Sequence, residues 1–165
     1  MEINFLVFFV AAFVPLVVGF IWYGPLFGNA WMNQMGFTKE SLKEANMTFT
    51  FLLSYAFSFL IAMTLQAIVV HQMGVYSTLA GEPDFMEETG AAFTYFQDFM
   101  TLYGNRFRTF KHGVLHGALV GVFLVLPILG IQAMFERKKV KYVAINAGYW
   151  ILTLALMGGI VCYWA

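Results

Sequence analysis

The feature that most limits how this chain can fold is the absence of charge over four long stretches. Uncharged runs of 36, 37, 24 and 24 residues cover positions 3–38, 45–81, 112–135 and 142–165. An α-helix that crosses a bilayer needs about 20 mostly apolar residues. The chain is 61% hydrophobic and 11% charged, whereas a soluble domain carries about 25% charged residues. The sequence therefore predicts a multi-pass helical membrane protein and excludes a soluble globular domain.

We expect one integral membrane domain over residues 1–165, folded as a compact four-helix bundle of the all-α class. The spans are expected at about 3–23, 49–73, 111–135 and 142–164. The first is expected to be a retained span, because it lacks the positive start of a signal peptide and its apolar run is longer.

A further helix start is expected between the first two spans. Thr38, or Ser41 with Glu44 three residues later, has the pattern of a helix N-cap. No helix breaker follows until Gly74. We therefore expect this helix to run directly into the second span.

The long connection at 74–110 contains a second pattern. Its later half places apolar side chains three and four residues apart, as on one face of a helix: Ala92, Phe93, Phe96, Phe99, Met100, Tyr103 and Phe107. Such a face suits a helix that lies in the membrane interface. We predict an interfacial amphipathic helix at about 89–104.

Small residues recur at helical spacing in the spans, where they let neighbouring backbones approach closely. The candidates for helix packing are Ser54, Ser58, Gly113, Gly117, Gly121, Gly148 and Gly159. These surfaces can pack within the bundle or against another chain, and the sequence leaves both alternatives open.

The distribution of Lys and Arg predicts an orientation. The first and third connections carry six basic residues (Lys39, Lys43, Arg137, Lys138, Lys139 and Lys141), and the second carries three (Arg106, Arg108 and Lys111). Cytoplasmic loops are richer in Lys and Arg. We expect both termini on the periplasmic side and the two shorter connections in the cytoplasm.

The three histidines of the chain form the first candidate site. His112 and His116 are one helical turn apart at the start of the third span, and His71 lies at the end of the second. Neutral imidazoles at this spacing can hold a metal ion. A carboxylate from the loop (Glu87, Glu88 or Asp98) could complete the site. The alternative is that these are interfacial histidines bonded to loop carbonyls.

Aromatic and amide side chains form the second candidate site at the opposite ends of the spans. Its members are Trp22, Tyr23, Trp31, Asn146 and Tyr149. They could line a polar pocket for a lipid headgroup or small solute. The alternative is an aromatic belt with one amide that satisfies broken backbone near Pro25.

Several stretches resemble a known family. They are IWYGPLFG at 21–28, AWM at 30–32, GFTKE at 36–40, HGAL at 116–119, INAGYW at 145–150 and MGGI at 157–160. The pattern is similar to that of the domain-of-unknown-function 1761 family of small bacterial membrane proteins. Where many members carry Asp before Ala-Gly-Tyr, this chain has Asn146. The resemblance implies four spans in a bacterial inner membrane and supplies no reaction.

These observations favour a function without catalysis. No charged side chain lies in the interior of a span, Lys111 standing at the first position of the third, although ionisable residues at membrane depth usually mark ion and proton pathways. We expect no enzyme, no cofactor and no nucleic-acid partner. The leading hypothesis is an oligomeric module or accessory subunit of a membrane complex. The alternatives are metal or solute binding through His71, His112 and His116, and a channel of several chains.

Overall fold

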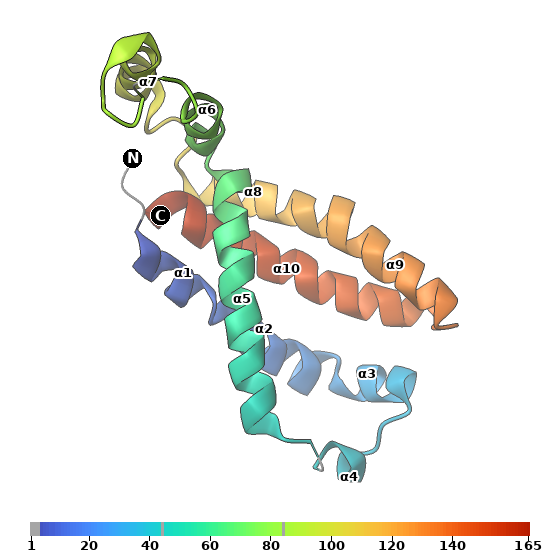
Figure 1. Ribbon diagram of the computed structural model, residues 1–165. Helices are drawn as coiled ribbons and strands as arrows, with labels where there is room; N and C mark the ends of the chain where they lie inside the picture. Colours follow the sequence, from blue (N-terminus) through green and yellow to red (C-terminus); the bar gives the residue numbers. More distant parts are fainter. Residues whose placement is uncertain (1–3, 44, 84) are drawn as a thin grey trace.

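The computed structural model describes residues 4–43, 45–83 and 85–165. The described chain is helical and contains no β-strand. Four helical stretches are long and apolar enough to cross a membrane: Phe5–Leu26, Met47–Val69, Phe110–Phe135 and Val140–Trp164. The all-α membrane fold with four candidate spans is confirmed, and Figure 1 shows their arrangement.

The first span consists of three helical pieces. Helix α1 covers Phe5–Ala11, α2 covers Val14–Ile21, and the π-helix η1 covers Trp22–Leu26. The sequence placed the end of this helix at Tyr23, but the backbone N–H of Phe27 bonds to the carbonyl of Trp22 at 2.8 Å. This wider turn accommodates Pro25, which has no N–H to donate. Helix α3 (Gly28–Met35) follows directly.

The prediction of a continuous helix from Thr38 into the second span is wrong. Thr38 caps α4 (Lys39–Leu42) in a capping box with Ser41, while Glu44 lies outside the described residues. Helix α5 (Met47–Val69) then begins separately, because the Asn46 side chain accepts a hydrogen bond from the N–H of Phe49 at 3.1 Å. Asparagine favours such a cap position over a helix interior.

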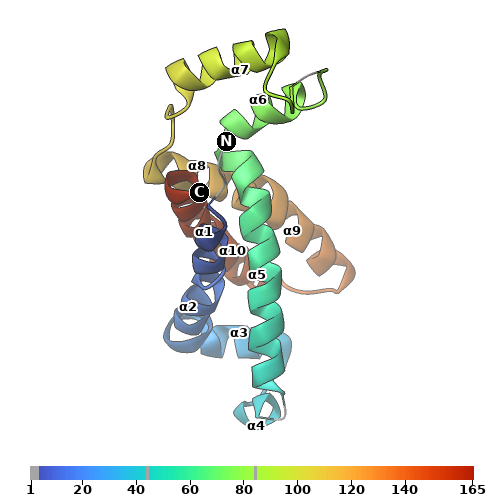
Figure 2. The same ribbon diagram turned by 60° about the vertical axis from the view of Figure 1, so that its left-hand side comes forward.

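The second span ends at Val69 and not at Met73. Val70 is extended, with φ −106° and ψ 92°, and α6 (Gln72–Leu79) starts after His71. Helix α7 (Gly90–Tyr103) then occupies the interval predicted for the interfacial helix at 89–104. Figure 2 shows α6 and α7 beyond the end of α5, with α7 lying across it. Aromatic contacts join them, including Tyr76 to Phe96 with ring centroids 5.8 Å apart.

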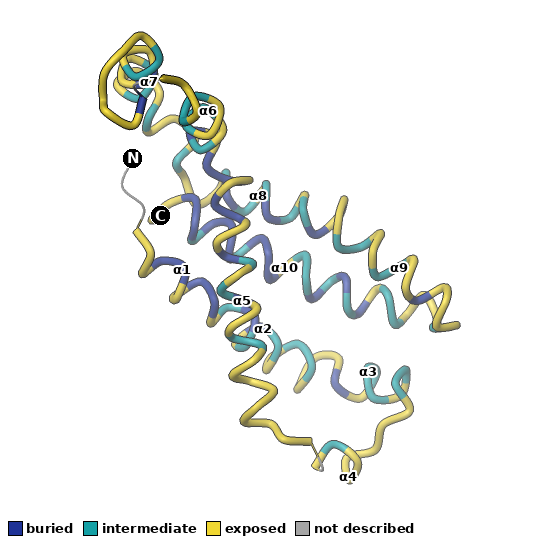
Figure 3. The backbone as a smooth tube through the Cα atoms, viewed as in Figure 1, coloured by how far each residue is buried: buried dark blue, intermediate teal, exposed yellow. Residues whose placement is uncertain are grey.

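Helix α10 (Val140–Trp164) is the centre of the bundle. It contacts α1, α2, α5 and α8 (Phe110–Val120). The third span continues from α8 through the π-helix η2 (Gly121–Val125) into α9 (Leu126–Phe135). In an 18-residue stretch of each span, 56% of the positions are buried in the fourth span and 11% in the third. Figure 3 shows buried positions concentrated on α10 and on the helix faces turned toward it.

The glycine ridge of α8 and η2 lies against α10. A Cβ atom added at Gly113 would collide with the carbonyl oxygen of Gly158, and one at Gly117 with that of Leu154. At Gly121 it would come within 2.7 Å of the Ile151 Cα atom. These contacts require glycine, because any larger residue would separate the two helices.

The remaining small residues are also used inside the chain. A Cβ atom at Gly159 would lie 2.6 Å from the Phe110 ring, and one at Gly148 would lie 3.0 Å from Trp22. Ser58 is 3% exposed, and its hydroxyl donates to the Ser54 carbonyl at 2.7 Å. Ser58 therefore faces the core of this chain and not the lumen of a channel, while Ser54 is half-buried.

The bundle exposes apolar side chains along its length. Among the most exposed are Phe20, Leu52, Phe123, Met134 and Phe135. The N-terminal half of α5 and most of α9 are exposed in Figure 3. Such surfaces fit contact with a lipid bilayer.

Candidate functional site

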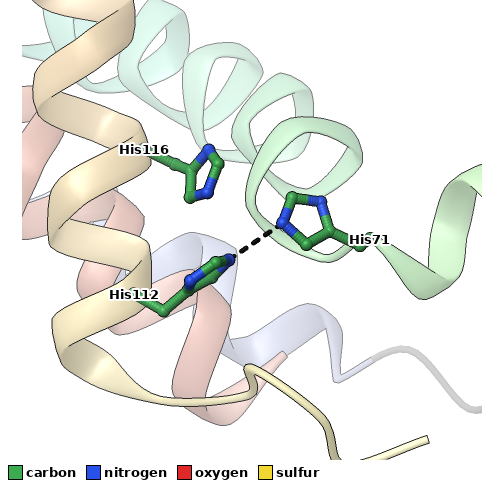
Figure 4. Close-up of side chains that lie close together, drawn as sticks. All are labelled: His71, His112 and His116. Atoms are coloured by element: carbon green, nitrogen blue, oxygen red, sulfur yellow. Dashed lines mark hydrogen bonds between the residues drawn. The ribbon is translucent and has the colours of Figure 1, made fainter. Parts of the chain in front are cut away.

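Two elements bring the three histidines together. His71 immediately precedes α6, where the chain turns after the end of α5. His112 and His116 lie on α8, whose N-terminus is capped by the Thr109 hydroxyl through the N–H of His112 at 3.2 Å. Because the neighbouring glycines of α8 face α10, the two histidines lie on another side of the helix, toward His71 (Figure 4).

The imidazoles form a compact group. The Nε2 atoms of His71 and His112 are 2.9 Å apart, so one donates a hydrogen bond and the other accepts it, according to tautomer. The ring centroid of His116 lies 4.9 Å from that of His71 and 4.3 Å from that of His112. One ring nitrogen from each histidine can be chosen so that all three atoms lie within 4.8 Å of one another.

Phe107 covers one side of this group. Its ring stacks on His112 with a centroid distance of 5.0 Å and an interplanar angle of 18°, and meets His71 edge-on at 6.4 Å. Phe107 has a positive φ of 63°, in the left-handed region that a bulky residue rarely adopts. The imidazoles thus lie between the start of α6, α8 and Phe107, three residues before α8.

The amide and aromatic residues of the second candidate site also meet. The Tyr23 hydroxyl donates to Asn146 Oδ1 at 2.8 Å, and Asn146 Nδ2 donates to the Tyr142 carbonyl at 2.8 Å. The Trp22 indole N–H donates to the Ile145 carbonyl at 3.0 Å. The π-turn η1 supplies both aromatic side chains.

Two further residues complete this second cluster. The Tyr23 ring lies 5.5 Å from that of Trp31 and 5.0 Å from that of Tyr149. The Tyr149 hydroxyl donates to the Pro15 carbonyl at 2.9 Å. Because these polar groups bond to one another and to backbone, the cluster has the properties of a packed contact between the first and fourth spans.

A family comparison identifies what this chain is related to. The family described as "Protein of unknown function (DUF1761)" matches residues 6–162. The chain belongs to this family. No curated protein and no solved structure matches it.

The family description assigns no chemistry, so the chemistry of this DUF1761 protein must be read from its side chains. Among the described residues, the group with metal-ligand geometry consists of His71, His112 and His116 alone. None of the carboxylates predicted to complete the site (Glu87, Glu88 or Asp98) belongs to this group. Glu88 and Asp98 line a separate cleft of about 690 Å³ beside α7. Neutral imidazoles without thiolate or carboxylate suit zinc, copper, iron or nickel.

Cys162 does not join the histidines, although it lies close to α8. Its buried Sγ donates to the carbonyls of Val69 at 3.3 Å and Phe107 at 3.4 Å. The thiol therefore fastens the fourth span to the end of α5 and to the start of α8.

Two residues of this region were missed by the sequence analysis. Phe107 was placed on the apolar face of the interfacial helix, but it lies beyond the end of α7 and against the histidines. Gln72 is 3% exposed and donates from Nε2 to the carbonyls of Tyr103 and Arg106. The span predicted at 49–73 included this glutamine and gave it no role of its own, whereas it begins α6.

Proposed function

We propose that this protein binds a transition-metal ion through His71, His112 and His116. The observation that carries the proposal is the convergence of three ligand nitrogens within 4.8 Å from two separate parts of the chain. His71 is exposed, and His112 and His116 are half-buried, so an ion can reach the group from outside the bundle. The proposal is for a binding protein and not for an enzyme.

The spacing is close to what a metal ion needs. Zinc binds imidazole nitrogen at about 2.0–2.1 Å with tetrahedral angles, which separates the nitrogens by about 3.4 Å. The His71–His112 pair at 2.9 Å is slightly closer than this, and the full group is wider. An ion would therefore require the three partly exposed rings to rotate slightly on binding. Three protein ligands leave a fourth position for an exogenous ligand.

The site lies at the end of the bundle where α1 begins and α10 ends. The Asn4 side chain donates to the Trp164 carbonyl at 3.3 Å, and the start of α8 packs against this end of α10, where a Cβ atom at Gly113 would lie 2.5 Å from the Cys162 side chain. If the Lys and Arg count gives the orientation, this end faces the periplasm of a bacterial inner membrane. The metal would then bind outside the cytoplasm.

Metal titration of the purified protein tests the proposal. The protein is prepared with a tag that lacks histidine, and Zn²⁺ and Cu²⁺ are titrated by calorimetry. We expect one ion per chain, with affinity reduced about 100-fold or more by His112→Ala or His116→Ala, since even second-shell losses cost 10- to 100-fold. Ser77→Ala is the control, since its hydroxyl bonds to the Gly74 carbonyl of its own helix α6. Binding that is absent, or that the histidine variants leave unchanged, would contradict the proposal.

Assembly with other chains has weaker support. The hypothesis of an oligomeric module or accessory subunit rested on small-residue surfaces, and those of α5 and α8 pack inside one chain. Assembly with another chain would therefore need a different contact surface, such as the exposed N-terminal half of α5. Because Cys162 is the chain's one cysteine and is buried, crosslinking through Leu52→Cys in native membranes tests this. A crosslinked dimer is expected if that surface mediates assembly, and strictly monomeric protein contradicts it.

A further inference from the structure

A small pocket adjoins the histidine group on the side of α7. It has a volume of about 210 Å³ and is lined by His71, Gln72, Phe99, Tyr103, Arg106 and Phe107. Two of its residues also belong to the surroundings of the metal ligands: His71 is one of the ligands, and Phe107 stacks on another. A molecule in this pocket would therefore lie next to a bound ion.

The walls of the pocket are mainly aromatic. The rings of Phe99 and Tyr103 contact each other with centroids 5.5 Å apart. Phe107 also lines the pocket, and the Arg106 guanidinium lies over that ring at 5.4 Å. Aromatic walls favour a flat ring, which gains both area burial and offset or edge contacts. The volume suffices for one ring with a small substituent.

Gln72 adds a hydrogen-bond acceptor to this region. Both hydrogens of its Nε2 are directed at carbonyls, those of Tyr103 at 2.8 Å and Arg106 at 2.9 Å. If the side-chain amide were flipped, Oε1 would face these two carbonyl oxygens with no hydrogen to share, so the hydrogen bonds fix the orientation of the amide. Oε1 is buried, and no donor among the described residues bonds to it. A buried acceptor without a donor destabilises the fold unless an ordered water or a ligand supplies one.

We propose that this pocket binds a small phenol or quinol from the membrane phase, beside the metal ion. The hydroxyl donates to Gln72 Oε1, and the ring packs among Phe99, Tyr103 and Phe107. A ligand that donates a hydrogen bond suits the site better than an anion does, because the oxygens of an anion would face the lone pairs of Gln72 Oε1. Because Oε1 is buried, a ring at the pocket wall must move for the ligand to enter. The inference rests on the proposed metal site only through the shared His71.

Three matched ligands test the inference in lipid nanodiscs. Calorimetry compares 4-methylphenol, 4-methylanisole and toluene on the zinc-loaded protein, with empty nanodiscs subtracted to remove partitioning into lipid. Only 4-methylphenol can donate a hydrogen bond. It should bind about two- to tenfold more tightly than the other two, which is the range expected of one hydrogen bond. Equal affinities, or no binding of any ring, overturn the inference.

Variants then place the ligand. Phe99→Trp should fill the pocket and abolish binding of 4-methylphenol, whereas Tyr95→Trp, on an exposed part of α7, should leave it unchanged. Gln72→Leu should still bind toluene but no longer favour the phenol. Unchanged binding by Phe99→Trp would show a different site and overturn the inference.

Zinc is measured in every sample, so a protein that binds zinc but no phenol refutes this inference alone. Selective phenol binding without zinc refutes the metal site alone.

Discussion

Tyr23 shows how a single side chain fixes the contact between the first and fourth spans. Its hydroxyl is a donor to Asn146 Oδ1. Tyr23→Phe leaves that oxygen without its donor in a half-buried position. Side-chain hydrogen bonds inside membrane proteins are worth about 0.6 kcal/mol on average and about 1.7 at most. We expect a loss of about 1 kcal/mol in the free energy of unfolding, measured by denaturant titration in detergent.

The control for this substitution is Tyr163→Phe. Tyr163 is exposed near the end of α10, and its hydroxyl makes no hydrogen bond within the described chain. Loss of the Tyr163 hydroxyl should change the free energy of unfolding by less than half of the change that Tyr23→Phe causes. Equal effects of the two substitutions would mean that the bond between Tyr23 and Asn146 contributes nothing to stability.

At the scale of single residues, the sequence located both candidate clusters but not their contacts. His112 and His116 could be paired from their spacing because a helix places them on one face. His71 could be added because consecutive spans return to the same side of the membrane. Phe107 could not be assigned, because its place against His112 depends on how the chain leaves α7. Such a turn has no periodic pattern.

The contact between α8 and α10 depends on glycine. Gly117→Ala adds a methyl group where the carbonyl of Leu154 lies, and backbone cannot rotate away as a side chain can. Overpacking of this kind costs about 1–3 kcal/mol. We expect Gly117→Ala to lower the free energy of unfolding by about that amount in thermal or denaturant unfolding of the detergent-solubilised protein.

Gly130→Ala is the matched control in the same span. A Cβ at Gly130 in α9 meets nothing within 4 Å, and alanine is favoured over glycine in a helix by about 1 kcal/mol. This variant should be as stable as the parent or more stable. If Gly117→Ala instead left the chain stable and only separated oligomers, the ridge would serve assembly and not the internal contact.

At the scale of elements, composition predicted the spans better than it predicted their interruptions. Length and the lack of charge located four helices, because both follow from the thickness of a bilayer. The two π-turns could not be predicted, since Pro25 and Pro127 are equally compatible with a kink or an end. The break before α5 depends on Asn46 acting as a cap, which a search for Gly and Pro overlooks.

For the whole molecule, a bound metal ion should join α6 and the chain that follows α7 to the bundle. His71 lies between α5 and α6, while His112 and His116 belong to α8. An ion that binds all three would stabilise the folded protein by about 2.7 kcal/mol at 100 times its Kd. It would also restrain α6 and, through Gln72, the chain that follows α7.

Hydrogen–deuterium exchange of the protein in nanodiscs measures this restraint. Adding Zn²⁺ should slow exchange in residues 72–79 and 104–112, because the ion holds α6 against α8. The buried centre of α10 provides an internal reference, since it is packed without the ion. The effect should vanish in His71→Ala, which removes the ligand on the α6 side while leaving two imidazoles on α8. If Zn²⁺ slowed exchange equally in His71→Ala, the ion would bind to α8 alone, and the two parts of the molecule would not be coupled through it.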